Sequence, residues 1–235
     1  MRGMLPRWVV IRTEVRAHSS PVAGFPQKGV EEWSRIGRSS QSMPRPKSFD
    51  PETALAKAMG VFWEKGYDAA SIADLTTAMG INRFSLYDTF GDKRTLYLKA
   101  LDYYENHIVE PMIEQVNATE SLDDIAAYFE RLIESQHTID HAPCCLMHKA
   151  AVDQSACDED TRRRVESIRS NVHAAFRDAL ARCRKNGDLR RGVSLTDAAW
   201  VLVLLQVGFA GFASTPVPRR DARAAIRTVL EQLRA

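Results

Sequence analysis

Cysteine is scarce in this sequence, which has only four in 235 residues: Cys144, Cys145, Cys157 and Cys183. Four cysteines clustered in the second half of the chain are too few to staple a small secreted scaffold. The apolar run Trp8–Ile11 is also too short for the core of a signal peptide. We therefore expect a cytoplasmic protein whose thiols are reduced.

A long hydrophobic run is missing as well. The longest uncharged stretch extends from Ala198 to Pro218, and its apolar part ends near Ala213. As a helix that part spans roughly 24 Å, less than the ~30 Å of a bilayer core. The stretch is predicted to be a buried helix, and no membrane partner is expected.

Charge of one sign is not in large excess, because the formal net charge is only +2. Residues 1–43 hold seven basic and three acidic side chains, whereas residues 44–91 and 92–235 each hold one more acidic than basic side chain. A nonspecific polyanion binder shows a broad basic face. This balance excludes such a binder, so any contact with DNA must come from a few well-placed groups.

Residues 1–43 differ in composition from the rest of the chain. They are rich in Gly, Pro, Ser and Arg, and no apolar periodicity persists in them. We interpret them as a disordered extension, with Met43 as an alternative start, and the Arg-rich composition faintly suggests a transit peptide.

Helical periodicity begins at Asp50 and continues almost to the end of the chain, and no segment alternates with the period of a strand. About nine helices and an all-α fold are therefore predicted. The helix over 92–116 contains Pro111, which is expected to kink it. Later helices are predicted over 121–139, 146–157, 159–186, 195–213 and 219–234.

Residues 71–90 are typical of two short helices joined by a four-residue turn. Ser71 and Asp74 have the spacing of a capping box, Gly80 permits the positive φ of a tight turn, and Asn82 can cap the second helix. A short polar helix held by a preceding helix fits the DNA major groove. An ordinary helical hairpin explains the same pattern.

The sequence of residues 50–97 resembles the N-terminal domain of TetR/AcrR family transcriptional regulators. The resemblance lies in the segments GYDAASIADL, AMGINRFSLYDTF and GDKRTLY. A weaker one links CCLMHKAAVD at 144–153 to the CLM stretch of a large subgroup whose members respond to small organic or reactive compounds.

The resemblance implies a homodimeric repressor that a ligand releases from a palindromic operator. It divides the chain into the extension 1–43, a three-helix helix-turn-helix domain 44–97, and a helical ligand-binding and dimerisation domain 98–235. The residues expected to contact double-stranded DNA are Ser71, Asn82, Arg83, Phe84, Ser85, Tyr87 and Lys93. Arg83 is expected to read a guanine edge, while Tyr87 and Lys93 match positions that touch phosphate. Phe84 stands where many members carry a small residue, and it can contact a thymine methyl group.

The effector is expected to be a small organic molecule, and no cofactor or metal is predicted. The candidate ligand-binding residues are Tyr103, Tyr104, His107, Tyr128, Phe129, Met147, Phe176 and Trp200, each of which is also a plausible core residue. His137, His141, Cys144, Cys145 and His148 fall within twelve residues. They leave open a thiol sensor at Cys144 and Cys145, a metal sensor, or two small buried side chains at a helix start.

The last two predicted helices are expected to pair with the same helices of a second copy. The residues expected at this dimer interface are Trp200, Leu204, Gly208, Gly211, Phe212, Ile226 and Leu230. An internal core explains the same apolar pattern. Two other classes remain, a helical enzyme and a protein-binding adaptor, but the sequence supplies no nucleophile with a base and an orienting group. We therefore expect no enzymatic activity.

Overall fold

The structure is a computed structural model that describes residues 49–138, 144–153, 158–212 and 215–235. The extension predicted for residues 1–43 lies outside the described residues, as do the side chain of His137 and the whole of His141 and Cys157.

Helices form nearly all of the described chain. They are α2 (Pro51–Lys65), α3 (Ile72–Met79), α4 (Arg83–Phe90), α5 (Lys93–Tyr104), the π-type turn η1 (Glu105–Val109), α6 (Glu110–Asn117), α7 (Leu122–Thr138), α8 (Leu146–Val152), α9 (Glu159–Lys185), α10 (Leu195–Gly211) and α11 (Arg219–Leu233). Because α5, η1 and α6 are continuous, the described residues contain nine helices, and the predicted all-α fold is confirmed. In the same residues the only strand-type pairing is an isolated bridge between Leu189 and Arg234.

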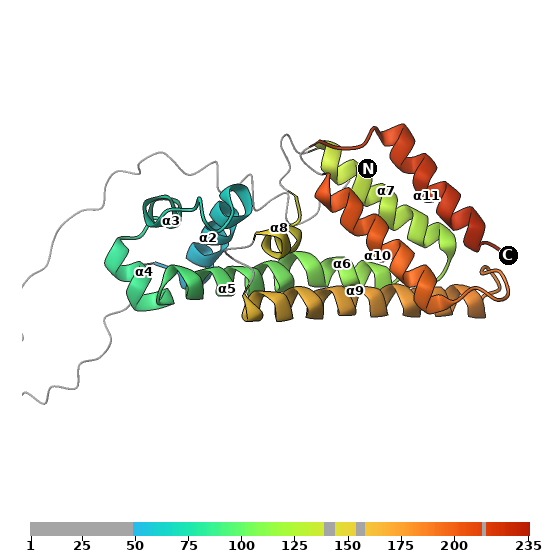
Figure 1. Ribbon diagram of the computed structural model, residues 1–235, viewed down its shortest axis with the longest axis horizontal. Coiled ribbons are helices and arrows are strands. Elements are labelled where there is room, and N and C mark those ends of the chain that lie inside the picture. The colour runs from blue at the N-terminus through green and yellow to red at the C-terminus, as the bar shows by residue number, and fades with distance from the viewer. Residues whose placement is uncertain (1–48, 139–143, 154–157, 213–214) are drawn as a thin grey trace, which may run out of the picture. The chain divides into compact units, whose positions relative to one another are not determined.

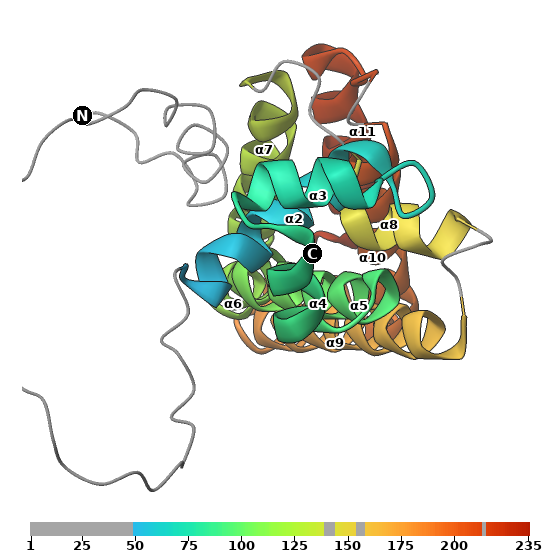
Figure 2. The same ribbon diagram turned by 90° about the vertical axis from the view of Figure 1, so that its left-hand side faces the viewer.

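The helices within Pro51–Ala235 form two groups along the long helix α5–η1–α6. Helices α2, α3 and α4 gather at its beginning, whereas α7, α10 and α11 lie over its other end (Figure 1). In the view from the first end, α3 and α4 lie in front of the other helices (Figure 2). This arrangement leaves α3 and α4 at an end of the helical body.

An aromatic cluster fixes α2 on α5. The Phe62 and Tyr97 rings are both buried and meet edge to face, with their centroids 5.0 Å apart. The Tyr67 ring packs against Tyr97 with a centroid distance of 4.9 Å. Aromatic pairs of this kind contribute about 0.5–1.5 kcal/mol to stability beyond the contribution of the area that they bury. The cluster therefore stabilises the packing of α2 on α5, next to the short helices α3 and α4.

The long helix is irregular next to Pro111. Proline has no N–H to donate to the carbonyl of His107 four residues earlier, and its ring crowds that carbonyl. Just before it the helix widens into η1, where the Glu110 N–H donates to the carbonyl of Glu105, five residues earlier. The irregularity expected at Pro111 therefore takes the form of a π-type turn.

Charged side chains fix α9 alongside α5. The Arg164 guanidinium donates two hydrogen bonds to the Asp102 carboxylate, at 2.6 and 3.2 Å. Arg94 donates to the Thr161 hydroxyl at 2.7 Å and pairs with Asp158. These bonds link the beginning of α9 to the part of α5 that carries the first helical group.

Helix α8 is shorter than the sequence predicts. Helix α8 ends at Val152, five residues before the predicted end at 157, and residues 154–157 lie outside the described chain. Helix α10 is the apolar stretch considered above, and in the described residues no helix is both long and apolar enough to cross a bilayer.

Candidate DNA-binding site

The start of α3 is fixed by a capping box, as predicted. The Asp74 backbone N–H donates to the Ser71 Oγ, and the Ser71 backbone N–H donates to the Asp74 carboxylate, both at 3.0 Å. The Lys65 ammonium donates to the same carboxylate at 2.6 Å. The bond from Lys65, followed by those from Ser71, holds the pKa of Asp74 far below its ordinary value.

The turn between α3 and α4 is held by local hydrogen bonds of residues that the sequence singled out. Gly80 has a φ of 71°, which favours glycine, and its N–H donates to the carbonyls of Thr76 and Thr77. The Asn82 side-chain oxygen accepts from the Ser85 N–H at 2.8 Å and caps α4. Leu75 and Leu86 are fully buried, so both helices are anchored in the core.

The outer face of α4 presents large side chains to solvent. Phe84 is 79% exposed and Tyr87 is 40% exposed, although Leu86 between them is buried. The Arg83 Nη2 donates to the Tyr87 hydroxyl at 3.4 Å, and the guanidinium lies 5.6 Å from the centroid of the Tyr87 ring. The first turn of α4 therefore presents a cation and two aromatic rings, a mixture suited to base edges and phosphates.

The other predicted DNA contacts lie nearby along the chain. Lys93 begins α5, where its ammonium lies 4.6 Å from the centroid of the Tyr67 ring and donates to the Asp68 carbonyl at 3.4 Å. The Ser71 hydroxyl donates to Asp74 at 2.7 Å, which places a carboxylate beside it. Sequence reasoning missed the contacts of Arg83 with Tyr87 and of Lys93 with Tyr67, although the four-residue spacing of the first pair was a usable signal.

The eight candidate ligand-binding residues occupy several places rather than one cavity. Tyr128 donates its hydroxyl to the Gln206 side chain at 2.8 Å, and Tyr104 donates to the Cys145 Sγ at 3.4 Å. Burial raises the pKa of both tyrosines. The Phe129 and Phe176 rings are fully buried and stack 6.0 Å apart, and Met147 is also buried. The Tyr103 ring stacks on His107 and the Trp200 ring stacks on His173.

A narrow crevice lies beside Tyr128. It is lined by Met112, Ile113, Val116, Tyr128, Val172, Ala175 and Gln206 and is too narrow to admit water. Its lining comes from α6, α7, α9 and α10, and α6 is the part of the long helix that follows the π-type turn.

The two adjacent cysteines stand at the start of α8. The Trp63 indole donates to the Cys144 carbonyl at 2.7 Å, which joins α8 to α2. Burial raises the pKa of the Cys144 thiol, whereas reactive thiols have a lowered pKa. In the described part of the chain no group of three or more His, Cys, Asp or Glu side chains is placed to hold a metal ion. Of the predicted cluster, His141 and the His137 side chain lie outside that part.

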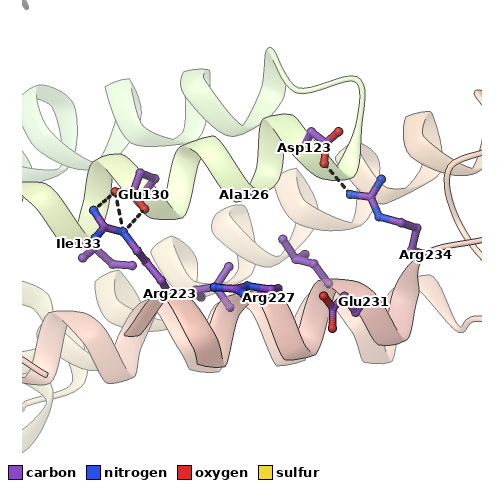
Figure 3. Close-up of a pocket in the computed structure, with 10 residues that line it drawn as sticks. Asp123, Ala126, Glu130, Ile133, Arg223, Arg227, Glu231 and Arg234 are labelled. Atoms are coloured by element: carbon purple, nitrogen blue, oxygen red, sulfur yellow. Dashed lines mark hydrogen bonds and ion pairs between the residues drawn. The ribbon is translucent and has the colours of Figure 1, made fainter. Parts of the chain in front are cut away.

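A groove of about 370 Å³ runs between α7 and α11 (Figure 3). At one end Arg223 binds Glu130, and at the other Arg234 binds Asp123, so ion pairs fasten the two helices together. None of the eight candidate ligand-binding residues lines it. Ile226 and Leu230 line it but are 5% and 4% exposed, which shows that they pack inside the chain.

Helix α10 carries four of the eight large apolar side chains that are exposed in the described residues. They are Trp200, Val201, Leu204 and Val207, and Phe212 follows at its end. Leu204 is 66% exposed, and a Cβ placed on Gly208 meets nothing within 4 Å. These side chains follow one another along the exposed face of α10.

The geometry defines a helix-turn-helix protein, and comparison with known proteins identifies its family. A family model described as "Bacterial regulatory proteins, tetR family" matches residues 54–100. The uncharacterized HTH-type transcriptional regulator YezE of Bacillus subtilis is 32% identical over 148 residues, which cover 63% of this chain and 76% of YezE. The HTH-type transcriptional repressor ComR of Escherichia coli is 28% identical over 164 residues, covering 68% and 77% of the two chains.

A solved structure gives the same result. The TetR family transcriptional regulator CifR, as a cysteine mutant complexed with 26-base-pair operator DNA, is 31% identical with a TM-score of 0.70. The match covers 80% of this chain and 98% of the CifR chain. The chain therefore belongs to the TetR family and is a DNA-binding transcriptional regulator. This family is one of regulators and not of enzymes, as the sequence predicted.

Proposed function

We propose that this protein is a repressor that binds a palindromic operator as a homodimer and is released by a small organic molecule. The observation that carries the proposal is the capped helix α4, whose outer face exposes Arg83, Phe84 and Tyr87 at an end of the helical body. ComR is named as a repressor, and CifR has been solved with operator DNA. We assign DNA binding to residues 44–97, and ligand binding and dimerisation to residues 98–235. We place the protein in the cytoplasm.

The dimer in this proposal forms through the exposed face of α10. Trp200, Leu204 and Phe212 supply apolar area, while Gly208 allows a second helix to approach closely. Gly211, which the sequence also suggested for the interface, instead faces His148 of its own chain, because a Cβ placed there meets the His148 Nε2 at 3.7 Å. A two-fold axis through this face makes the interface self-complementary and presents two copies of α4 to two DNA half-sites. Since Ile226 and Leu230 pack against α7, their part in the interface is to hold α11 in place.

The effector in this proposal opens the crevice beside Tyr128. Because the crevice does not admit water, a ligand must separate its walls and break the bond between Tyr128 and Gln206. A ligand that binds the opened state more tightly shifts the population toward that state. Met112 and Ile113 belong to the wall that moves, and they lie just beyond the π-type turn.

The long helix carries this movement to the DNA-binding end. A change at α6 reaches α5, which packs against α2 through the cluster of Phe62, Tyr67 and Tyr97. A dimer on DNA requires its two recognition helices to lie about 34–36 Å apart. A shift of a few ångströms in that spacing costs contacts at one half-site, and the operator is released.

Two assays test the proposal. Footprinting of the full chain on the DNA upstream of its own gene is expected to show one protected palindrome whose occupancy falls as salt rises. Protection spread evenly over all sequences would contradict an operator-specific repressor. A thermal-shift screen of small organic compounds is expected to find one that stabilises the protein and removes the footprint.

A further inference from the structure

Phe84 is exposed for no reason that the fold supplies. Its neighbours Leu86 and Phe90 fill the core, and the Asn82 cap and Gly91 fix both ends of α4 without it. Phe84 is the most exposed of the large apolar side chains on α4 and α10, at 79%. The Phe84 ring, together with the Arg83 cation, gives the first turn of α4 both an apolar and a charged contact group.

The position of Phe84 on α4 separates it from Arg83. Residues 83 and 87 lie one turn apart on the same face, where the Arg83 guanidinium meets the Tyr87 hydroxyl and ring. Residue 84 lies about 100° further round the helix. The two side chains therefore point in different directions from the first turn of α4, which allows them to contact different base pairs in a major groove.

Only one base edge in the major groove is apolar, the 5-methyl group of thymine, whereas guanine presents two acceptors at O6 and N7. We propose that Arg83, held by Tyr87, reads a guanine and that Phe84 reads the 5-methyl group of a thymine on a neighbouring base pair. This inference rests on the proposed function, since it names the bases that the same helix selects.

Tyr87 is a positioning residue in this arrangement. Its hydroxyl accepts a hydrogen bond from the Arg83 Nη2, and its ring lies beneath the guanidinium. A guanidinium fixed in this way loses less conformational freedom when it donates both bonds to guanine. A phosphate contact by the same hydroxyl would instead strengthen binding to every sequence equally.

The test of Phe84 removes single methyl groups from DNA. The probe is the protected operator duplex, with each thymine replaced in turn by deoxyuridine. Wild type is expected to lose affinity about fourfold at one thymine of each half-site, the value of one buried methyl group. Phe84→Ala is expected to bind thymine and deoxyuridine equally at that position, with an unchanged melting temperature because the ring is exposed.

The test of Tyr87 uses 7-deazaguanine, which lacks the N7 acceptor. Wild type is expected to lose affinity about tenfold when one guanine of each half-site is replaced by 7-deazaguanine. Arg83→Ala is expected to bind guanine and 7-deazaguanine equally at that position. Tyr87→Phe, which lacks only the hydroxyl, is expected to show a smaller 7-deazaguanine penalty than wild type. If Tyr87→Phe lost affinity for the guanine and 7-deazaguanine duplexes by the same factor, Tyr87 would be assigned to a phosphate contact and its positioning role would be overturned.

The outcomes separate the two levels of the proposal. The reading of thymine by Phe84 is overturned if wild type binds every deoxyuridine-substituted duplex as tightly as the operator. It is also overturned if Phe84→Ala keeps the full loss of affinity for deoxyuridine. In both cases the repressor function stands. Absence of any protected operator overturns the proposed function and the base reading together.

Discussion

The Trp63 indole N–H donates a 2.7 Å hydrogen bond to the carbonyl of Cys144, 81 residues later in the chain. Within α8, the Lys149 ammonium donates to the carbonyls of Trp63 and Glu64, at 3.1 and 2.9 Å. These carbonyls belong to the last turn of α2, which has no intrahelical donors for them. Helix α8 therefore closes the end of α2, the first helix of the helix-turn-helix domain, and couples it to the second half of the chain.

Lys149→Met tests this connection. The variant keeps most of the aliphatic stem and loses the two charge-assisted bonds, so the free energy of unfolding is expected to fall by about 1–2 kcal/mol. Urea denaturation measures the change. Lys185→Met, at an exposed lysine at the end of α9, is the control and is expected to lie within about 0.5 kcal/mol of wild type. Equal effects of the two substitutions would show that the bonds to α2 contribute nothing specific.

The exposed face of α10 is tested by Leu204→Arg and Gly208→Leu. The first places a charge in the proposed interface, and the second blocks close approach at a position where an added Cβ meets no atom of the chain itself within 4 Å. Each is expected to raise the dimer dissociation constant at least about a hundredfold, because an unpaired buried charge or a clash costs several kcal/mol. Sedimentation is expected to show a folded monomer.

Val152→Arg is the matched control for the dimer. Val152 is 63% exposed but stands alone on α8, so this variant is expected to sediment as wild type does. A dimer that persists in both α10 variants would place the interface on another surface.

The capping box of α3 predicts a dependence of stability on pH. Because the pKa of Asp74 is lowered in the folded chain, its contribution is present above about pH 4 and is lost as the pH falls toward the folded-state value. In Asp74→Asn the stability difference from wild type is therefore expected to be largest near pH 7 and to shrink below pH 4. Asp88→Asn, on the exposed face of α4, is the control. Thermal denaturation at several pH values would contradict the account if the difference were constant.

The sequence predicted the helices and their caps because these depend on neighbouring residues. Ser71 with Asp74, Gly80 and Asn82 each act over one turn, so their roles were visible in the sequence. The bonds from Trp63 to Cys144 and from Lys149 to the end of α2 join segments more than 80 residues apart, and no local pattern reports them.

The candidate sites divide in the same way. The exposure of Arg83, Phe84 and Tyr87 followed from the spacing of Leu86 and Phe90, whereas the contact between Arg83 and Tyr87 required side-chain geometry. The period of α11 placed Ile226 and Leu230 on one apolar face, but it did not say which helix covers that face. The structure shows that it is α7. The sequence does not separate ligand-binding residues from core residues, because aromatic side chains at helical spacing serve a core and a pocket equally.

Replacement of both Cys144 and Cys145 by Ser separates an organic effector from thiol chemistry. Since burial raises the pKa of Cys144, we expect the double variant to release the operator at the same effector concentration as wild type, within about twofold. The assay is operator binding with the inducing compound present and zinc chelated. Loss of the response while operator affinity is kept would show that the switch is thiol or metal chemistry.

A salt titration of operator binding tests most directly whether α4 of this chain selects a DNA sequence. Affinities of wild type, Arg83→Ala and Lys93→Ala would be measured for the operator and for a scrambled duplex between low and physiological salt. Arg83→Ala is expected to lose about 1–3 kcal/mol of discrimination, and Lys93→Ala to weaken both duplexes equally with a salt slope lower by about one. If Arg83→Ala kept its full preference for the operator and changed only the salt slope, α4 would not read sequence through Arg83, and the account would be wrong.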